Sequence, residues 1–107
     1  GTENYKCRAW VNFNGVGTVS IREAGNVSSV TDGGTGIFTI NFTTDFSDAD
    51  YATVCSSANS FNTWPRIIAA GTSANPTYSV SAVGLYIVRS DNNSAEDNDR
   101  TQVAIFR

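Results

Sequence analysis

Apolar and polar residues alternate along the first part of this chain, which is the pattern of a β-strand with one buried face. Successive side chains of a strand point to opposite sides of the sheet, so residues two apart share a face. Apolar side chains occupy five consecutive odd positions: Tyr5, Cys7, Ala9, Val11 and Phe13. The even positions between them are polar except for Trp10. We therefore expect residues 5–13 to form a strand that buries its odd-numbered face.

Turn residues divide the rest of the chain into similar segments. Asn14-Gly15 is a hairpin signal, and Gly17 predicts a bulge or a slightly longer connection before the chain resumes as a strand. Further strands are predicted at 18–22, 37–43, 51–56, 66–70, 77–88 with a break at Gly84, and 101–106. The Gly-rich segment 31–36 is expected to be a turn. The sequence therefore predicts an all-β fold, a jelly-roll-like antiparallel β-sandwich of about seven strands with little or no helix.

Length and charge limit the functions that this fold can serve. The 107 residues predict a single domain over residues 1–107, and the absence of Met favours a segment of a longer chain over a chain that has lost its initiator. The net charge of −3 provides no basic surface, which argues against nucleic acid as a partner. No apolar run approaches the roughly 20 residues of a membrane span, so we expect no membrane insertion.

The chain contains no His, which removes the commonest general base and metal ligand. The carboxylate pairs Asp48 with Asp50 and Asp97 with Asp99 lie in turn-like segments. The oxygen-rich segment 91–99 has two interpretations, a calcium loop or an ordinary hydrated loop, and it lacks the spacing of a known calcium loop. We therefore predict no enzyme activity, no catalytic residue, no cofactor and no metal site.

Aromatic residues near polar side chains are the candidates for binding. The loop before residue 66 holds Phe61, Asn62 and Trp64, followed by Arg66. Flat rings beside amide and guanidinium groups suit the faces of sugars, and loops at the end of a scaffold commonly carry binding residues. Trp64 has a second interpretation, as a lid over the edge of the core. We predict Phe61, Asn62, Trp64 and Arg66 as receptor-binding residues.

Trp10 is large and apolar but lies on the polar side of the first strand, beside Arg8 and Asn12. Either a subunit interface or a second packed sheet is expected to cover it, and we predict Trp10, Arg8 and Asn12 at a subunit interface. Cys7 and Cys55 also allow two interpretations, a disulfide or two free thiols that pack as small apolar groups.

About half of the chain is similar to one known module. The runs A-W-V-N-F-N-G, N-V-S-S-V-T-D and F-T-I-N-F-T occur in this order within residues 6–43, and residues 48–51 continue the pattern. This pattern resembles the module at the carboxyl end of bacteriophage tail fibres, notably those of cyanobacterial and marine phages. The last strand, which ends with 103–106, also resembles that family. Residues 56–100 depart from the pattern.

The resemblance implies a homotrimeric, β-rich fibre tip that contacts a host cell-surface glycan or envelope receptor and carries no catalytic residues. It implies a place in the virion tail fibre, assembled in the host cytoplasm together with other virion proteins. A reducing cytoplasm makes a disulfide less expected. The segments 56–65 and 90–100 are predicted to meet the host. The alternative is a structural virion protein, such as a capsid decoration or tail adaptor domain, that binds only other virion subunits.

Overall fold

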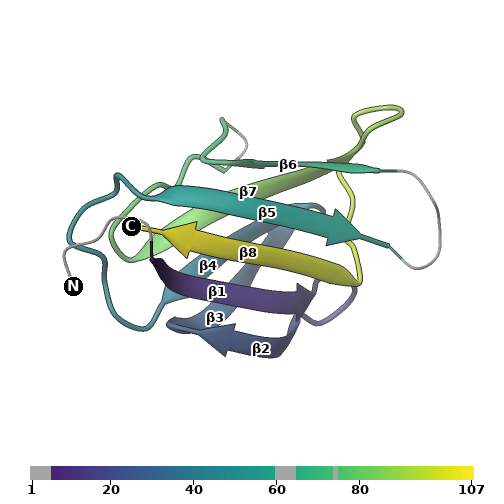
Figure 1. The fold of residues 1–107 in the computed structure, drawn as a ribbon. Helices are drawn as coiled ribbons and strands as arrows, with labels where there is room; N and C mark the ends of the chain where they lie inside the picture. Colours follow the sequence, from purple (N-terminus) through teal and green to yellow (C-terminus); the bar gives the residue numbers. More distant parts are fainter. Residues whose placement is uncertain (1–5, 60–64, 74) are drawn as a thin grey trace.

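The computed structural model describes residues 6–59, 65–73 and 75–107 of the chain. Within these residues, eight β-strands and no helix form two four-stranded sheets that face each other (Figure 1). The strands are β1 (Cys7–Asn14), β2 (Ser20–Gly25), β3 (Val27–Gly34), β4 (Ile37–Phe42), β5 (Ala52–Ala58), β6 (Arg66–Ala70), β7 (Ala82–Arg89) and β8 (Arg100–Phe106). All strand pairs are antiparallel. The predicted antiparallel β-sandwich is confirmed, with one strand more than expected.

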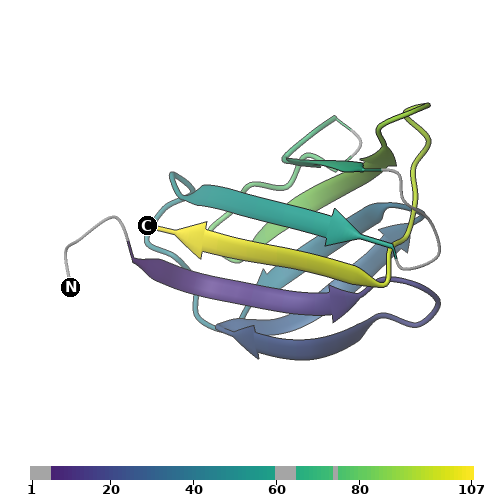
Figure 2. The same ribbon diagram turned by 45° about the vertical axis from the view of Figure 1, so that its right-hand side comes forward.

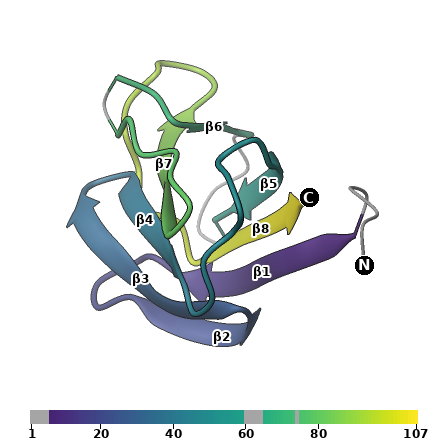
Figure 3. The same ribbon diagram turned by 90° about the vertical axis from the view of Figure 1, so that its left-hand side faces the viewer.

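The two sheets are built from strands that are distant in the sequence. Sheet A has the order β2-β1-β8-β5, and sheet B has the order β3-β4-β7-β6. The chain passes from one sheet to the other after β2, β4, β5 and β7. The first and last strands lie side by side at the centre of sheet A, where Val11 pairs with Val103 (Figure 2). Turning the molecule by 90° shows β1, β8 and β5 across the core from β3, β4 and β7 (Figure 3).

The alternating residues of β1 and β4 form much of the core between the sheets. Ala9, Val11 and Phe13 are at most 1% exposed, whereas Trp10 between them is 41% exposed. On β4, the three alternating apolar side chains, Phe38, Ile40 and Phe42, are also buried. The rings of Phe13 and Phe38 meet edge to face across the two sheets, with centroids 5.3 Å apart. The buried and solvent-facing sides of these strands are those that the alternation predicts.

β3 is the strand that hydrophobic patterning did not predict. The expectation that residues 31–36 form a turn is wrong, because β3 continues to Gly34 and only Thr35 and Gly36 remain between β3 and β4. β3 is an edge strand of sheet B, and most of its side chains are exposed. Only Val27 and Val30 pack against the core. Backbone pairing with β4 therefore holds this strand, and its mainly polar side chains carry no periodic signal.

The predicted strand 77–88 is also different in the structure. β7 begins at Ala82 and passes through Gly84 without a break. The preceding segment folds back over the sheet, so that the Gly84 N–H donates to the Thr77 carbonyl at 2.8 Å. A Cβ at Gly84 would lie 2.5 Å from the side-chain amide carbon of Asn75. Glycine at this position therefore makes room for a loop that covers the strand, rather than interrupting it.

The sandwich has two different ends. At one end, which we call the terminal end, β1 starts and β8 finishes, and Cys7 pairs with Phe106 (Figure 1). At the opposite end, which we call the loop end, lie the β1–β2, β3–β4 and β7–β8 connections. The β7–β8 connection joins the other two: the Gly15 N–H donates to the Asn98 carbonyl at 2.9 Å, and the Gly36 N–H donates to Asp97 Oδ1 at 2.8 Å.

Candidate functional site

Of the four predicted receptor-binding residues the structure describes only Arg66, which lies at the loop end. Phe61, Asn62 and Trp64 lie outside the described residues. Arg66 begins β6, and its side chain has no exposed surface. In this position the guanidinium of Arg66 interacts with other parts of the chain rather than with solvent.

Arg66 connects the start of β6 to the β7–β8 connection. Its Nη2 pairs with Glu96 Oε1 at 2.6 Å, and its Nε donates to Asn98 Oδ1 at 2.7 Å. Asn59, just after β5, also donates its side-chain N–H to Glu96 Oε1, at 3.2 Å. Asn98 is fully buried. The sequence contains no signal that separates Asn98 from the neighbouring solvated residues, so pattern reasoning missed this role.

The carboxylates that the sequence offered for acid–base chemistry are held in local structure. Asp48 accepts two hydrogen bonds from the Arg107 guanidinium, at 3.0 and 2.7 Å, and one from the Asp50 N–H at 2.9 Å. The hydrogen bonds from Arg107, followed by that from the Asp50 backbone, lower the pKa of Asp48 to about 2. Such a carboxylate stays ionised at neutral pH and is a poor general acid. Within the described ranges, no group of three or more His, Cys, Asp or Glu side chains could hold a metal ion.

Trp10 lies on the solvent side of sheet A, in an apolar row that crosses the whole sheet. It pairs with Ala104 on β8, and Ala104 pairs with Val54 on the edge strand β5. On the other side Trp10 pairs with Gly25, where a Cβ would overlap the indole ring. Trp10 is 41% exposed and Val54 is 61% exposed. No second sheet covers Trp10 in the described structure, so that expectation is wrong, and the subunit interface stays a prediction.

A row of polar side chains runs beside this apolar row. Asn12 pairs with Gln102 on β8, and Gln102 pairs with Ser56 on β5. Asn12 Oδ1 is buried but has no hydrogen-bond partner among the residues that the structure describes. Together the two rows border a shallow groove of about 320 Å³, whose lining carries no charged side chain. We call this surface the sheet A face; it is defined by Trp10, Asn12, Val54, Gln102 and Ala104.

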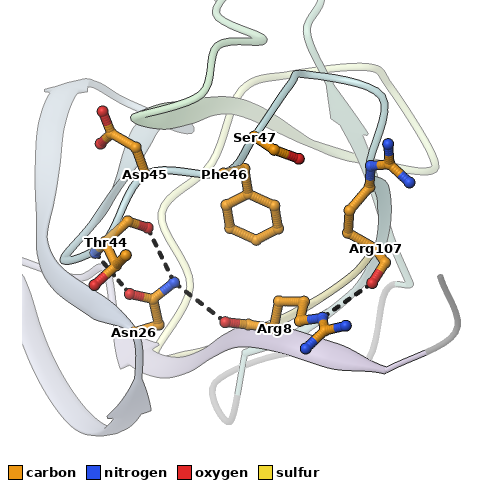
Figure 4. A pocket seen from close by; sticks show the side chains of 7 residues that line it. All are labelled: Arg8, Asn26, Thr44, Asp45, Phe46, Ser47 and Arg107. Atoms are coloured by element: carbon orange, nitrogen blue, oxygen red, sulfur yellow. Dashed lines mark hydrogen bonds between the residues drawn. The ribbon is translucent and has the colours of Figure 1, made fainter. Parts of the chain in front are cut away.

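Arg8, which was predicted at the same interface as Trp10 and Asn12, lines a different pocket from these two residues. The Arg8 Nε donates to the Arg107 carbonyl at 3.0 Å, at the terminal end. Here Arg8 borders a pocket of about 360 Å³ (Figure 4). The pocket is lined by Arg8, Asn26, Thr44, Asp45, Phe46, Ser47 and Arg107. Sequence patterning did not predict this pocket, because it assembles from both ends of the chain and two connections.

The two cysteines do not form a disulfide in this fold. Cys7 pairs with Phe106 on one side of β8, and Cys55 pairs with Val103 on its other side. Two strand spacings and three residues along β8 separate them by roughly 14 Å, well beyond the reach of about 7 Å between disulfide-bonded Cα atoms. Both thiols are free, and burial raises the pKa of Cys55 to about 11.

Comparison of the chain with family models, curated proteins and solved structures finds no match. Among the described residues, no helix has the length and apolar character needed to cross a membrane. The arrangement of the sheet A face, the loop end and the terminal-end pocket is therefore the basis for assigning a function.

Proposed function

We propose that this chain is an adhesion module without catalytic activity, which assembles as a homotrimer through the sheet A face and presents its loop end to a host-cell receptor. This is the function of a receptor-binding tip of a bacteriophage tail fibre. The observation that supports it best is the exposed row of Trp10, Ala104 and Val54 on the sheet A face. Exposed apolar surface of this kind, flanked by polar groups, is typical of protein interfaces.

Further copies of the same chain are the partners that fit this face best. Each copy carries a net charge of −3, so contact between copies is least unfavourable where no like charges are brought close together. The groove on the sheet A face has no charged lining residue. The amide side chains of Asn12 and Gln102 lie beside the apolar row and can donate and accept hydrogen bonds across such a contact. The sequence resemblance to tail-fibre tips supports three copies.

The direction of the chain supports binding at the loop end. β1 starts and β8 finishes at the terminal end, so a neighbouring part of a longer chain would attach there (Figure 1). The loop end, with the 90–99 connection, would then face away from the attachment. Three copies side by side would present three loop ends together, which raises avidity even when each contact with a surface glycan is weak.

A structural virion protein, such as a capsid decoration or tail adaptor domain, is the second candidate. The observation in its favour is the burial of Arg66, whose guanidinium holds two connections together and has no exposed surface for a receptor. In this role the sheet A face would serve the same assembly, but the loop end would bind only other virion subunits.

Two measurements separate these functions. Light scattering of the purified chain should give three times its mass of 11.4 kDa, and a monomer at micromolar concentration would contradict the proposed assembly. The labelled trimer should then bind cyanobacterial or marine bacterial cells saturably, in competition with unlabelled trimer. A trimer without saturable binding to a panel of such cells would favour the structural virion protein.

A further inference from the structure

The pocket at the terminal end is lined by other residues than the sheet A face and lies away from the loop end. It lies between the start of β1, the end of β8, the β2–β3 turn and the β4–β5 connection (Figure 4). Its volume of about 360 Å³ falls within the range of roughly 300–1,000 Å³ found for small-molecule sites. The side chains around it are mostly polar, and the ring of Phe46 lies at their centre (Figure 4).

The wall of the pocket is fixed by the side chain of Asn26. Asn26 has a φ of 55°, the left-handed conformation that suits a tight turn between β2 and β3. Its side-chain N–H groups donate to the carbonyls of Arg8 and Thr44, each at 3.2 Å, and its Oδ1 accepts from the Thr44 N–H at 2.7 Å. One side chain thus joins β1 to the β4–β5 connection.

The floor of the pocket is equally well held. The Phe46 N–H donates to the Val80 carbonyl at 2.8 Å. The ring of Phe46 packs 4.7 Å from that of Phe42 and 5.0 Å from that of Tyr51, measured between centroids. A site whose groups are already in place loses little conformational freedom when a ligand binds. The pocket is therefore preformed, with an apolar floor and a polar rim.

The charges around the pocket are balanced. Arg107 is paired with Asp48 through two hydrogen bonds, which use two of the five N–H groups of a guanidinium. Arg8 is oriented by its bond to the Arg107 carbonyl, and Asp45 lies across the pocket with an exposed side chain (Figure 4). An anion would be attracted by the arginines but repelled by Asp45. An apolar ligand would leave the polar rim without partners.

We propose that this pocket binds one neutral sugar unit in its ring form. Phe46 is 9% exposed, and a pyranose combines an apolar C–H face, which can contact the part of its ring that stays exposed, with hydroxyl groups that both donate and accept. The sugar hydroxyls can donate to the Asp45 carboxylate and accept from the Arg107 guanidinium. The side-chain hydroxyls of Thr44 and Ser47 can donate to the sugar or accept from it. Mixed donors and acceptors around an apolar floor are complementary to a sugar.

The inference extends the proposed adhesive function by naming a glycan site away from the loop end, but it can be tested independently of assembly. A ¹⁵N-labelled sample of the chain would be titrated with glucose, galactose, mannose, N-acetylglucosamine, glucuronate and the open-chain polyol mannitol. At least one neutral pyranose should shift the amide signals of residues 44–47 and of Arg8 saturably, with a millimolar Kd. The trimer mass and cell binding are measured separately, so either proposal can fail alone.

A matched pair of variants makes the test specific. Asp45→Asn should weaken binding about tenfold, because it removes the carboxylate that accepts from the sugar. Asp32→Asn removes the same charge from an exposed aspartate on β3 and should leave the affinity unchanged. The proposal is overturned if no pyranose gives saturable shifts, if mannitol or glucuronate binds as well as the best neutral pyranose, or if both variants behave alike.

Discussion

Replacing Val54 by Lys should dissociate the trimer without unfolding the sandwich. Val54 lies on β5, at one edge of the sheet A face, and 61% of the residue is exposed in the isolated chain. Its side chain therefore contributes little to the fold of one copy. In the proposed trimer, however, Val54 would be part of the same apolar contact as Ala104 and Trp10, with which it lines one groove. A lysine ammonium placed there would lose its water without gaining an opposite charge.

The size of the effect follows from the exposed area. Complete burial of a valine side chain is worth roughly 1.5–3 kcal/mol, so the exposed part of Val54 corresponds to about 1–2 kcal/mol per subunit. Over three subunits the loss is about 3–6 kcal/mol, which raises the trimer dissociation constant by roughly 10²- to 10⁴-fold, with the desolvation of lysine adding to it.

Sedimentation velocity over a range of concentrations measures this shift, and circular dichroism reports on the fold of each variant. Ile67→Lys is the control, because Ile67 is 50% exposed on the edge strand β6 of the other sheet. Ile67→Lys should remain trimeric at the concentrations at which Val54→Lys dissociates. The reasoning is refuted if Val54→Lys stays trimeric, or if the two variants dissociate to the same extent while both remain folded.

Three further outcomes follow from the polar contacts and the buried thiol. Arg66→Met should destabilise the fold by roughly 1.5–3 kcal/mol in urea denaturation, because Glu96 and Asn98 lose hydrogen bonds from a buried guanidinium, while Glu96 keeps Arg89 at 3.6 Å. Asp48 has a pKa of about 2 in the folded chain against 3.8 ordinarily, so its pair with Arg107 stabilises the fold above about pH 4, and this contribution is lost as the pH falls through 2. Asp48→Asn should therefore lower stability at neutral pH and make no difference near pH 2. Since burial raises the pKa of Cys55 to about 11, this thiol should react slowly with Ellman's reagent at pH 8 until the chain unfolds.

Each of these outcomes has a result that contradicts it. If Arg66→Met unfolds at the same urea concentration as the natural chain, the buried pair does not hold the loop end. A stability difference for Asp48→Asn that persists unchanged down to pH 2 would show that the ion pair is not its cause. Fast reaction of Cys55 in the folded protein, measured in a Cys7→Ser variant, would show that this thiol is accessible.

The sequence predicted the fold best where one face of a strand is buried. On β1 and β4 the apolar side chains fall on alternate positions because each strand has one face against the core, and Phe13 and Phe38 meet where the pattern places them. The same rule placed Trp10 on the solvent side, which led directly to the sheet A face. Alternation is informative there because the environment itself alternates.

The candidate sites were harder to predict, because they depend on contacts between distant segments. Arg66 and Glu96 are separated by β6 and β7, and nothing in the local pattern shows that the two meet. The unpaired Oδ1 of Asn12 is equally invisible, since it depends on what surrounds the side chain in three dimensions. Gly25-Asn26 was the one available local signal for the pocket, because this dipeptide is typical of a tight turn. The alternation of apolar and polar residues showed which strand faces are buried or exposed. The contacts between polar side chains could be recognised only in the folded structure.

The central position of β8 has a consequence for biosynthesis. β8 pairs with β1 on one side and with β5 on the other, so β5 has no partner in sheet A, and β1 has only β2, until β8 has left the ribosome. Pairing strands so far apart in sequence is slow, and the unfinished edges can bind other nascent chains in the meantime. A polypeptide truncated before β8 would also lack Ala104 between Trp10 and Val54. Assembly through the sheet A face, as proposed, would thereby be restricted to copies whose translation has reached the final strand.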